Sequence, residues 1–235
     1  LDIGCGRGIL TSSLVDSGFD VYGTEYNHFS ITGADKRVTI RIAPNLGKAG
    51  FAESFFDVVI LRHVLEHLPN PSETIQEIHR ILRPTGRLMV EVPNFSSFQS
   101  RWTKFAWFPL APCLNHIFQF SVYSLEILLE RGGFTVIAKR HFSIEQDTFG
   151  WIQSALNRIQ RLPRDTLYQL MHNRAPEETP PVSFVTVMLL KTALVLGLPI
   201  ALFLTFVGAI FHNGGTIEVL AIPKKETDSL LPITG

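Results

Sequence analysis

Short apolar runs alternate with amphipathic stretches through the first two thirds of the chain. The apolar runs that predict strands are 1–3, 19–25, 38–42, 56–61, 87–92 and 134–138, with a seventh at 216–222. Apolar residues recur every three or four positions in 9–17, 72–82 and 124–130, which predicts helices there. Continuously apolar strands such as 56–61 are typical of a parallel sheet that is covered on both faces. The pattern therefore predicts an α/β fold with a doubly wound sheet.

A glycine-rich turn joins the first strand to the first helix. Gly4, Gly6 and Gly8 stand at alternate positions there. Because glycine has no Cβ, a ligand can approach the backbone of such a turn, and the first N–H groups of the following helix point toward the same place. Glu25 ends the second strand, where a carboxylate can accept hydrogen bonds from both hydroxyls of a ribose. The turn and the acid together predict a nucleotide site.

The spacing of these glycines distinguishes between two nucleotide folds. A nicotinamide-binding turn has the pattern Gly-x-Gly-x-x-Gly, whose third glycine would fall at position 9. Ile9 occupies that position, and the third glycine is Gly8. A nicotinamide oxidoreductase is therefore disfavoured and stays an alternative.

The segment Leu-Asp-Ile-Gly-Cys-Gly-Arg-Gly at 1–8 closely resembles the first motif of class I S-adenosylmethionine (SAM)-dependent methyltransferases. Later segments that resemble the same family are 56–59, 63–71, 81–88, 92–94, 116–121 and 132–134. The resemblance covers most of 1–142, resumes at 214–222 and is to the type 11/type 23-like branch, which includes quinone-biosynthesis methyltransferases. It implies a Rossmann-like, seven-stranded sheet whose last strand is antiparallel, with SAM as the cofactor.

The resemblance also implies which residues hold SAM. The corresponding positions are Asp2, Gly4, Cys5, Gly6, Gly8, Glu25, Tyr26, Asn45 and His63. The residues around the glycine turn would line the methionine side, and Glu25 would bind the ribose hydroxyls. Tyr26 could flank the adenine, while Asn45 is the nearest equivalent of an acid that often meets the adenine amino group. His63 would close over the cofactor from the loop after the fourth strand.

His63, Glu66 and His67 have the spacing that places three side chains on one helix face. Some quinone-biosynthesis methyltransferases bind a metal near this position, but structural hydrogen bonds made by Glu66 and His67 explain the pattern better, and we expect no metal. His67 and His116 are the candidates for a general base, because a histidine can deprotonate a hydroxyl near neutral pH. Methyl transfer depends chiefly on the alignment of acceptor, methyl and sulfur, so a base is not obligatory.

An apolar segment interrupts the sheet pattern between the sixth and seventh strands. Residues 182–211 are apolar apart from Lys191, and their last 20 residues carry no charge, enough to cross a bilayer as a helix. A single crossing is excluded if the two flanking strands pair in one sheet. Because 197–199 reads Gly-Leu-Pro, we expect a helical hairpin that dips into one leaflet, with Lys191 reaching the headgroups. The alternative is an apolar interface in a homodimer.

The amino-acid composition of the chain gives information on its cellular compartment and on its binding partners. The 21 basic and 21 acidic residues balance, so no global field favours binding to nucleic acid. Cys5 and Cys113 are far apart, which favours a reducing cytoplasm over a disulfide framework, and Cys5 is expected to be a small buried residue. Since the chain starts inside a strand at Leu1, we expect a natural N-terminal segment to precede it.

Together these patterns predict a SAM-dependent methyltransferase on the cytoplasmic face of a membrane. Its acceptor would be a small amphipathic molecule, such as a quinone precursor, a lipid or a lipid-linked glycan. The alternative function is a non-catalytic SAM-fold scaffold that uses the apolar segment for assembly. The predicted organisation is a SAM-binding core at 1–142, a helical insertion at 143–215 with its hairpin at 182–211, a final core strand at 216–222 and a polar tail at 223–235.

Overall fold

The computed structural model describes residues 1–28, 31, 33–111, 115–171 and 183–224. Cys113 and most of the predicted polar tail lie outside the described residues. The chain forms two compact units. The sheet unit comprises 1–92, 122–139 and 218–235, and the helical unit comprises 93–121 and 140–217.

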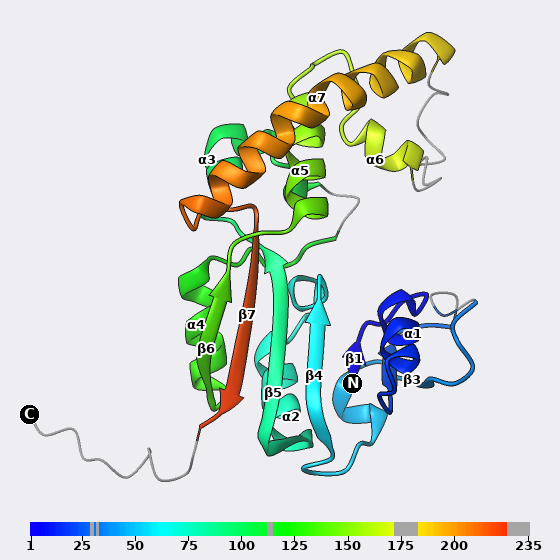
Figure 1. Ribbon diagram of the computed structural model, residues 1–235, viewed down its shortest axis with the longest axis vertical. Coiled ribbons are helices and arrows are strands. Elements are labelled where there is room, and N and C mark those ends of the chain that lie inside the picture. Colours follow the sequence, from blue (N-terminus) through cyan, green and yellow to red (C-terminus); the bar gives the residue numbers. More distant parts are fainter. Residues whose placement is uncertain (29–30, 32, 112–114, 172–182, 225–235) are drawn as a thin grey trace, which may run out of the picture. The chain divides into compact units, whose positions relative to one another are not determined.

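A seven-stranded sheet forms the centre of the sheet unit (Figure 1). Its strands are β1 (Asp2–Ile3), β2 (Tyr22–Glu25), β3 (Thr39–Ile42), β4 (Phe56–Arg62), β5 (Leu82–Pro93), β6 (Phe134–Arg140) and β7 (Thr216–Pro223). They lie in the order β3-β2-β1-β4-β5-β7-β6, and the first five in that order pair in parallel. β7 is antiparallel to its neighbours. The predicted Rossmann-like sheet with an antiparallel last strand is confirmed.

The helices of the sheet unit begin and end close to the predicted positions. They are α1 (Ile9–Asp16), η1 (Leu46–Ala49), η2 (Leu65–His67), α2 (Pro71–Ile81) and α4 (Val122–Arg131). α2 begins with a proline, which needs no hydrogen-bond partner in the first turn, and it buries Ile75, Ile78 and Ile81 completely. Burial of three isoleucines at this spacing explains why the sequence forms a helix here.

β5 is longer than predicted. The expected strand starts at position 87, whereas β5 starts at Leu82 and runs through Pro84. A register irregularity between Phe56 and Val58 of β4 accommodates the added residues, because Phe56 pairs with Leu82 while Val58 pairs with Arg87. Such a bulge lets a strand continue through a proline and a glycine that would otherwise end it.

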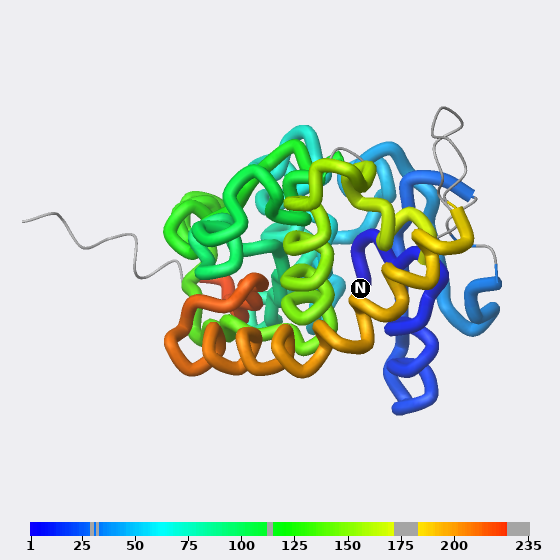
Figure 2. The backbone as a smooth tube through the Cα atoms, turned by 90° about the horizontal axis from the view of Figure 1, so that it is seen from above, coloured from blue at the N-terminus to red at the C-terminus, as the bar shows by residue number. Residues whose placement is uncertain are grey.

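The helical unit contains α3 (Phe98–Thr103), η3 (Lys104–Ala106), η4 (Phe108–Leu110), α5 (Ile144–Leu156), α6 (Thr166–Met171) and α7 (Phe184–Ile210). α7 packs against α5, and Figure 2 shows its long tube passing α5. The buried residues of this core are Trp151, Ile152, Leu156, Leu167, Leu190 and Ala201. The core is therefore built from the inner stripe of α7, the apolar side of α5 and Leu167 of α6.

The predicted hairpin of 182–196 and 200–211 is wrong, because α7 is one continuous helix of 27 residues with Pro199 inside it. A proline removes only one backbone hydrogen bond from a helix and crowds the preceding turn. Leu190 and Ala201 lie on either side of this point and pack into the same core, which holds both halves in one helix. The chain leaves β6 through α5 and returns to β7 through α7, so no turn at 197–199 is needed.

Candidate functional site

The glycine turn after β1 has the backbone conformation that its sequence predicts. Gly4, Gly6 and Gly8 have φ values of 70°, 52° and 78°. Residues with a Cβ disfavour this left-handed region, so three glycines allow the tight turn. The N–H groups of Gly4 and Cys5 donate to the carbonyl of Thr24 at 2.9 and 3.1 Å, which ties the turn to the end of β2.

The surroundings of these glycines differ. A Cβ on Gly4 would lie 2.5 Å from Cγ2 of Val64, so the backbone of the turn touches the loop after β4. A Cβ on Gly6 would meet nothing within 4 Å. The turn is therefore closely packed on one side and open on the other.

A cavity of about 820 Å³ lies in the sheet unit at the ends of β1, β2, β3 and β4. Ligands bind at this edge of open α/β sheets, outside the carboxyl ends of the strands. The predicted site residues that line the cavity are Gly4, Glu25, Tyr26, Asn45, His63 and His67. Residues from four separate loops thus line one cavity, whereas the predicted site residues Asp2, Cys5, Gly6 and Gly8 are not among those that line it.

Glu25 and Asn45 are held in place by neighbouring backbone groups. A carboxylate oxygen of Glu25 accepts a hydrogen bond from the N–H of Tyr26 at 3.1 Å, which fixes the acid at the end of β2. The side-chain oxygen of Asn45 accepts from the N–H of Lys48 at 3.0 Å and caps η1. Both side chains reach the cavity wall with defined orientations.

Asp2 and Cys5 are buried beneath the turn. Burial raises the pKa of Asp2 to about 6 and that of the Cys5 thiol to about 12. A thiol with so high a pKa carries almost no thiolate at neutral pH, so Cys5 is not a nucleophile. The sulfur lies against Gly23, where an added Cβ would be 2.6 Å away. Cys5 is the small buried residue that the sequence predicts.

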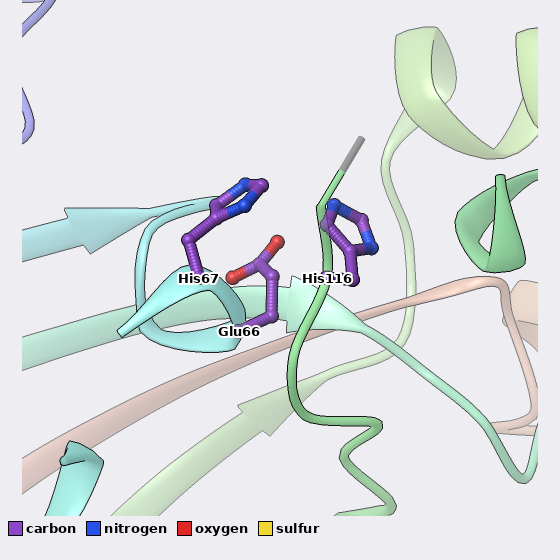
Figure 3. Close-up of side chains that lie close together, drawn as sticks. All are labelled: Glu66, His67 and His116. Carbon is purple, nitrogen blue, oxygen red and sulfur yellow. The ribbon is translucent and has the colours of Figure 1, made fainter. Parts of the chain in front are cut away.

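The two candidate bases belong to different units. His67 lies on η2 of the sheet unit, next to Glu66, as Figure 3 shows, and it lines the cavity half-buried. His116, also drawn in Figure 3, belongs to the helical unit, where it is half-buried. Of these two residues, the structure thus brings His67 to the wall of the cavity.

A buried ionic network surrounds His63 at the end of β4. Its backbone has a φ of 54°, and its N–H donates to the carbonyl of Glu91 at 2.9 Å. The imidazole lies between two carboxylates, with Nδ1 3.4 Å from Glu66 Oε1 and Nε2 3.3 Å from Glu91 Oε1. Arg62 Nε donates to the other oxygen of Glu91 at 2.7 Å. Two anions and two cations thus compensate one another beside the cavity.

The network fixes the protonation state of His63. Burial by itself lowers the pKa of His63, but Glu66 and Glu91 together outweigh it and raise the pKa to about 9. For Glu91, burial raises the pKa, but His63 and Arg62 bring it down to about 2. His63 is therefore an imidazolium at neutral pH and is not available as a base. Sequence reasoning missed Glu91, although an acid inside the apolar run 88–92 was a visible signal.

Replacing Glu91 with glutamine is expected to lower the free energy of unfolding by about 2 kcal/mol, because His63 loses one of its two carboxylate partners and Arg62 loses its ion pair. The folded-state pKa of His63 exceeds its ordinary value of 6.5, so its stabilisation is complete below pH 6.5 and is lost as pH rises toward 9. The stabilisation from Glu91 is present above its ordinary pKa of 4.5 and is lost as pH falls toward 2. Urea denaturation near pH 6 and above pH 9 measures the difference.

The matched control is Glu126→Gln, which breaks the exposed ion pair between Glu126 and Lys139. We expect this change to cost less than about 0.5 kcal/mol at either pH. An equal loss of stability for Glu91→Gln at both pH values would contradict the imidazolium assignment.

Comparison with known proteins assigns this arrangement to a family. A family model described as a methyltransferase domain matches residues 1–139, which is more than half of the chain. The chain belongs to this methyltransferase family. The chain is 32% identical over 140 residues to a probable SAM-dependent methyltransferase of Mycolicibacterium smegmatis, covering 58% of this chain and 51% of that protein. It is 31% identical over 103 residues to a ubiquinone biosynthesis O-methyltransferase of Photobacterium profundum, covering 40% and 43%.

The methyltransferase spans about half the length of the curated relatives it matches. Among solved structures it is similar to a SAM-dependent methyltransferase of Archaeoglobus fulgidus, with a TM-score of 0.57, 18% identity and coverage of 94% of this chain and 84% of that one. It is also similar to phosphoethanolamine N-methyltransferase 2 of Haemonchus contortus in complex with SAM, with a TM-score of 0.58, 14% identity and coverage of 95% and 48%. At these identities the two structures support the fold.

SAM is the cofactor of this family. The residues of the sheet unit fit such a molecule in three respects. The cavity is large enough for a nucleoside with a side chain, the glycine turn is open beside Gly6, and Glu25 supplies a fixed carboxylate.

Proposed function

We propose that the chain transfers the methyl group of SAM to a small amphipathic acceptor at a membrane surface. The observation that carries the first part is the cavity that joins the glycine turn to Glu25. Glu25 would accept hydrogen bonds from the ribose hydroxyls, while Gly4, which lines the cavity, and the open space beside Gly6 would take the methionine part. Tyr26 flanks the adenine, and Asn45 meets its edge.

SAM supplies a methyl group bound to a positively charged sulfur. In the proposed in-line transfer, a lone pair of the acceptor would form the new bond to this methyl carbon as the carbon–sulfur bond breaks, and the electron pair of the broken bond would stay on sulfur. If the attacking atom is a hydroxyl oxygen, its proton passes to a base. His67 lines the cavity and is proposed for this step, since the neighbouring His63 is already protonated. His116 stays a prediction for the same role.

The membrane part of the proposal rests on α7. It is the one helix among the described residues that is long and apolar enough to cross a membrane. Its large side chains are mostly exposed in the chain, including Phe184, Val185, Leu189, Val195, Leu196, Ile200, Phe203 and Ile210. A helix that is apolar on all sides needs cover, and α5 covers only one stripe. Lipid is the cover that we propose.

A helix lying in one leaflet fits better than a crossing. α7 is about 40 Å long, so it could span a bilayer by length. The chain would then have to cross a second time, and its partner α5 buries Asp147, Gln153 and Ser154 among its 13 residues. Such a helix is too short and too polar to span. We therefore propose that α7 enters one leaflet from the cytoplasmic side.

The acceptor class follows from this location. Relatives of the chain are named ubiquinone biosynthesis O-methyltransferases. A quinone precursor, a lipid and a lipid-linked glycan all present a polar, methylatable group beside an apolar part. We propose an acceptor of this class, methylated at oxygen, carbon or nitrogen.

The double substitution Leu196→Lys and Ile200→Lys is expected to release the chain from membranes, because it puts two charges on the exposed side of α7. The test incubates the chain with SAM that carries a labelled methyl group and with vesicles of total bacterial lipid. We expect the unaltered chain to float with the vesicles and to transfer label to the organic phase. The double variant stays at the bottom of the gradient, while its binding of S-adenosylhomocysteine (SAH) is unchanged.

A matched control puts lysines at Phe19 and Tyr123, two exposed side chains of the sheet unit, and should float as the unaltered chain does. Flotation of the α7 variant would contradict membrane docking. Conversion of a dimer to a monomer by that variant, without any change in flotation, would favour the homodimer interface instead. Binding of SAH without transfer to any lipid acceptor would favour the scaffold.

A further inference from the structure

A second cavity lies in the helical unit, separate from the one that we assign to SAM. It has a volume of about 360 Å³ and lies between α3, α5 and α7. The residues that line this groove are Phe98, Arg101, Trp102, Trp151, Leu204 and Val207. Five of the six are apolar or aromatic, so the groove suits a hydrocarbon rather than a polar ligand.

Two tryptophans form one wall of the groove. The rings of Trp102 and Trp151 meet edge to face with their centroids 5.8 Å apart. Trp151 belongs to the buried core between α5 and α7, while Trp102 is 64% exposed. The pair is thus anchored in the core through Trp151 and exposed to solvent through Trp102. Exposed aromatic side chains in such a setting often mark binding sites.

Arg101 is the one charged residue among those that line the groove. Its Nε donates to the carbonyl of Ser96 at 3.0 Å, which fixes the guanidinium on one side. A guanidinium has five N–H donors, and this bond uses one of them. The remaining donors suit the oxygens of a phosphate, which arginine binds in a two-point geometry. The groove thus combines an apolar channel with a site for an anion.

The helix that lines the groove also has an exposed apolar side. Phe203 and Phe206 are the chain neighbours of lining residues Leu204 and Val207, and they are 66% and 49% exposed. If α7 lies in a leaflet, a hydrocarbon chain can pass from the lipid phase into the groove without crossing water.

We propose that the groove binds the hydrocarbon tail of a lipid phosphate and that Arg101 binds its phosphate group. The proposal rests on the membrane docking of α7, because the membrane would supply the lipid phosphate. It also narrows the acceptor class, because a phospholipid or a phosphate-linked lipid glycan has both a tail and a phosphate, whereas a quinone precursor has no phosphate. The groove then holds the acceptor by the part that does not react.

The test uses ω-bromododecyl phosphate, because bromine quenches the fluorescence of a tryptophan that it touches. The chain has three tryptophans, and Trp107 is fully buried. We expect saturable quenching that falls sharply when Trp102 and Trp151 are replaced with phenylalanine. Val207→Phe fills the groove and should weaken binding about tenfold or more, since the tail loses its buried apolar contact.

The matched control for the filled groove is Ile200→Phe, which enlarges an exposed residue of the same helix outside the groove. It should bind the probe as the unaltered chain does. Arg101→Gln should weaken binding of the phosphate about tenfold and remove the preference over ω-bromododecanol. Because Arg101 is exposed, this variant tests the site with little risk to folding.

Equal binding by Val207→Phe and the unaltered chain would overturn the proposal, as would an unchanged preference for phosphate in Arg101→Gln. Flotation and SAH binding are measured on the same samples. If the chain fails to float but its quenching depends on Val207, the membrane docking of α7 is wrong and binding in the groove is supported. If the chain floats normally but its quenching does not change in Val207→Phe, binding in the groove is wrong and the membrane docking of α7 stands.

Discussion

Gly6→Ala is expected to fold and yet to lose about a hundredfold or more of the affinity for SAH, because its new Cβ enters the space proposed for the ligand. The substitution costs about 1–2 kcal/mol through the positive φ of this residue. It adds no contact within the chain, since nothing lies within 4 Å of the new atom. Calorimetric titration with SAH and a thermal melt separate the two effects.

Gly4→Ala is the informative companion, because its Cβ would collide with Val64 at 2.5 Å. The clash and the strained φ together should lower the free energy of unfolding by about 3 kcal/mol and displace the loop after β4. Gly4→Ala should therefore lose both stability and binding, whereas Gly6→Ala loses chiefly binding. Retention of full SAH affinity by Gly6→Ala would contradict the placement of the cofactor beside the turn.

Glu25→Ala is expected to weaken SAH binding about a hundredfold, because the two charge-assisted hydrogen bonds that we propose to the ribose hydroxyls would be lost. Glu25→Gln should lose less, about tenfold, since the amide keeps one acceptor oxygen but no charge. Calorimetry at one pH and salt concentration measures both variants.

The control for Glu25 is an SAH analogue without ribose hydroxyls. It should bind the unaltered chain weakly and should be insensitive to either substitution at Glu25. An equal effect of Glu25→Ala on SAH and on the analogue would show that the acid supports the cavity wall without touching the ribose.

The sheet and the glycine turn were predictable because their signals are local. Each buried strand is a short apolar run, and Gly4, Gly6 and Gly8 mark a turn whose φ values only glycine adopts readily. The position of Glu25 at the end of β2 was predictable for the same reason, because the apolar run that forms the strand and the acid that ends it are adjacent in sequence. These features need no knowledge of distant contacts.

The continuity of α7 was not predictable from local signals. Gly197 and Pro199 are helix breakers by intrinsic preference, and the prediction of a hairpin followed that preference. Packing of Leu190 and Ala201 against α5 overrides it, and the partner of that packing lies some 40 residues away in sequence. Tertiary contacts of this kind decide between a helix and a turn.

The network around His63 depends on register between strands. Arg62 and Glu91 are partners across β4 and β5 although they are 29 positions apart in sequence. The predicted start of the fifth strand was five residues late, and the bulge that sets its register has no local signal. The sequence therefore placed His63 at the site but could not show that two buried carboxylates hold it as a cation.

Calorimetric titration of the unaltered chain with SAH tests whether the cavity of the sheet unit binds the cofactor. If the cavity of the sheet unit is the SAM site, the chain binds one SAH molecule, and Gly6→Ala and Glu25→Ala each reduce that binding as stated above. An absence of binding by the unaltered chain, or binding that neither substitution changes, would contradict the account.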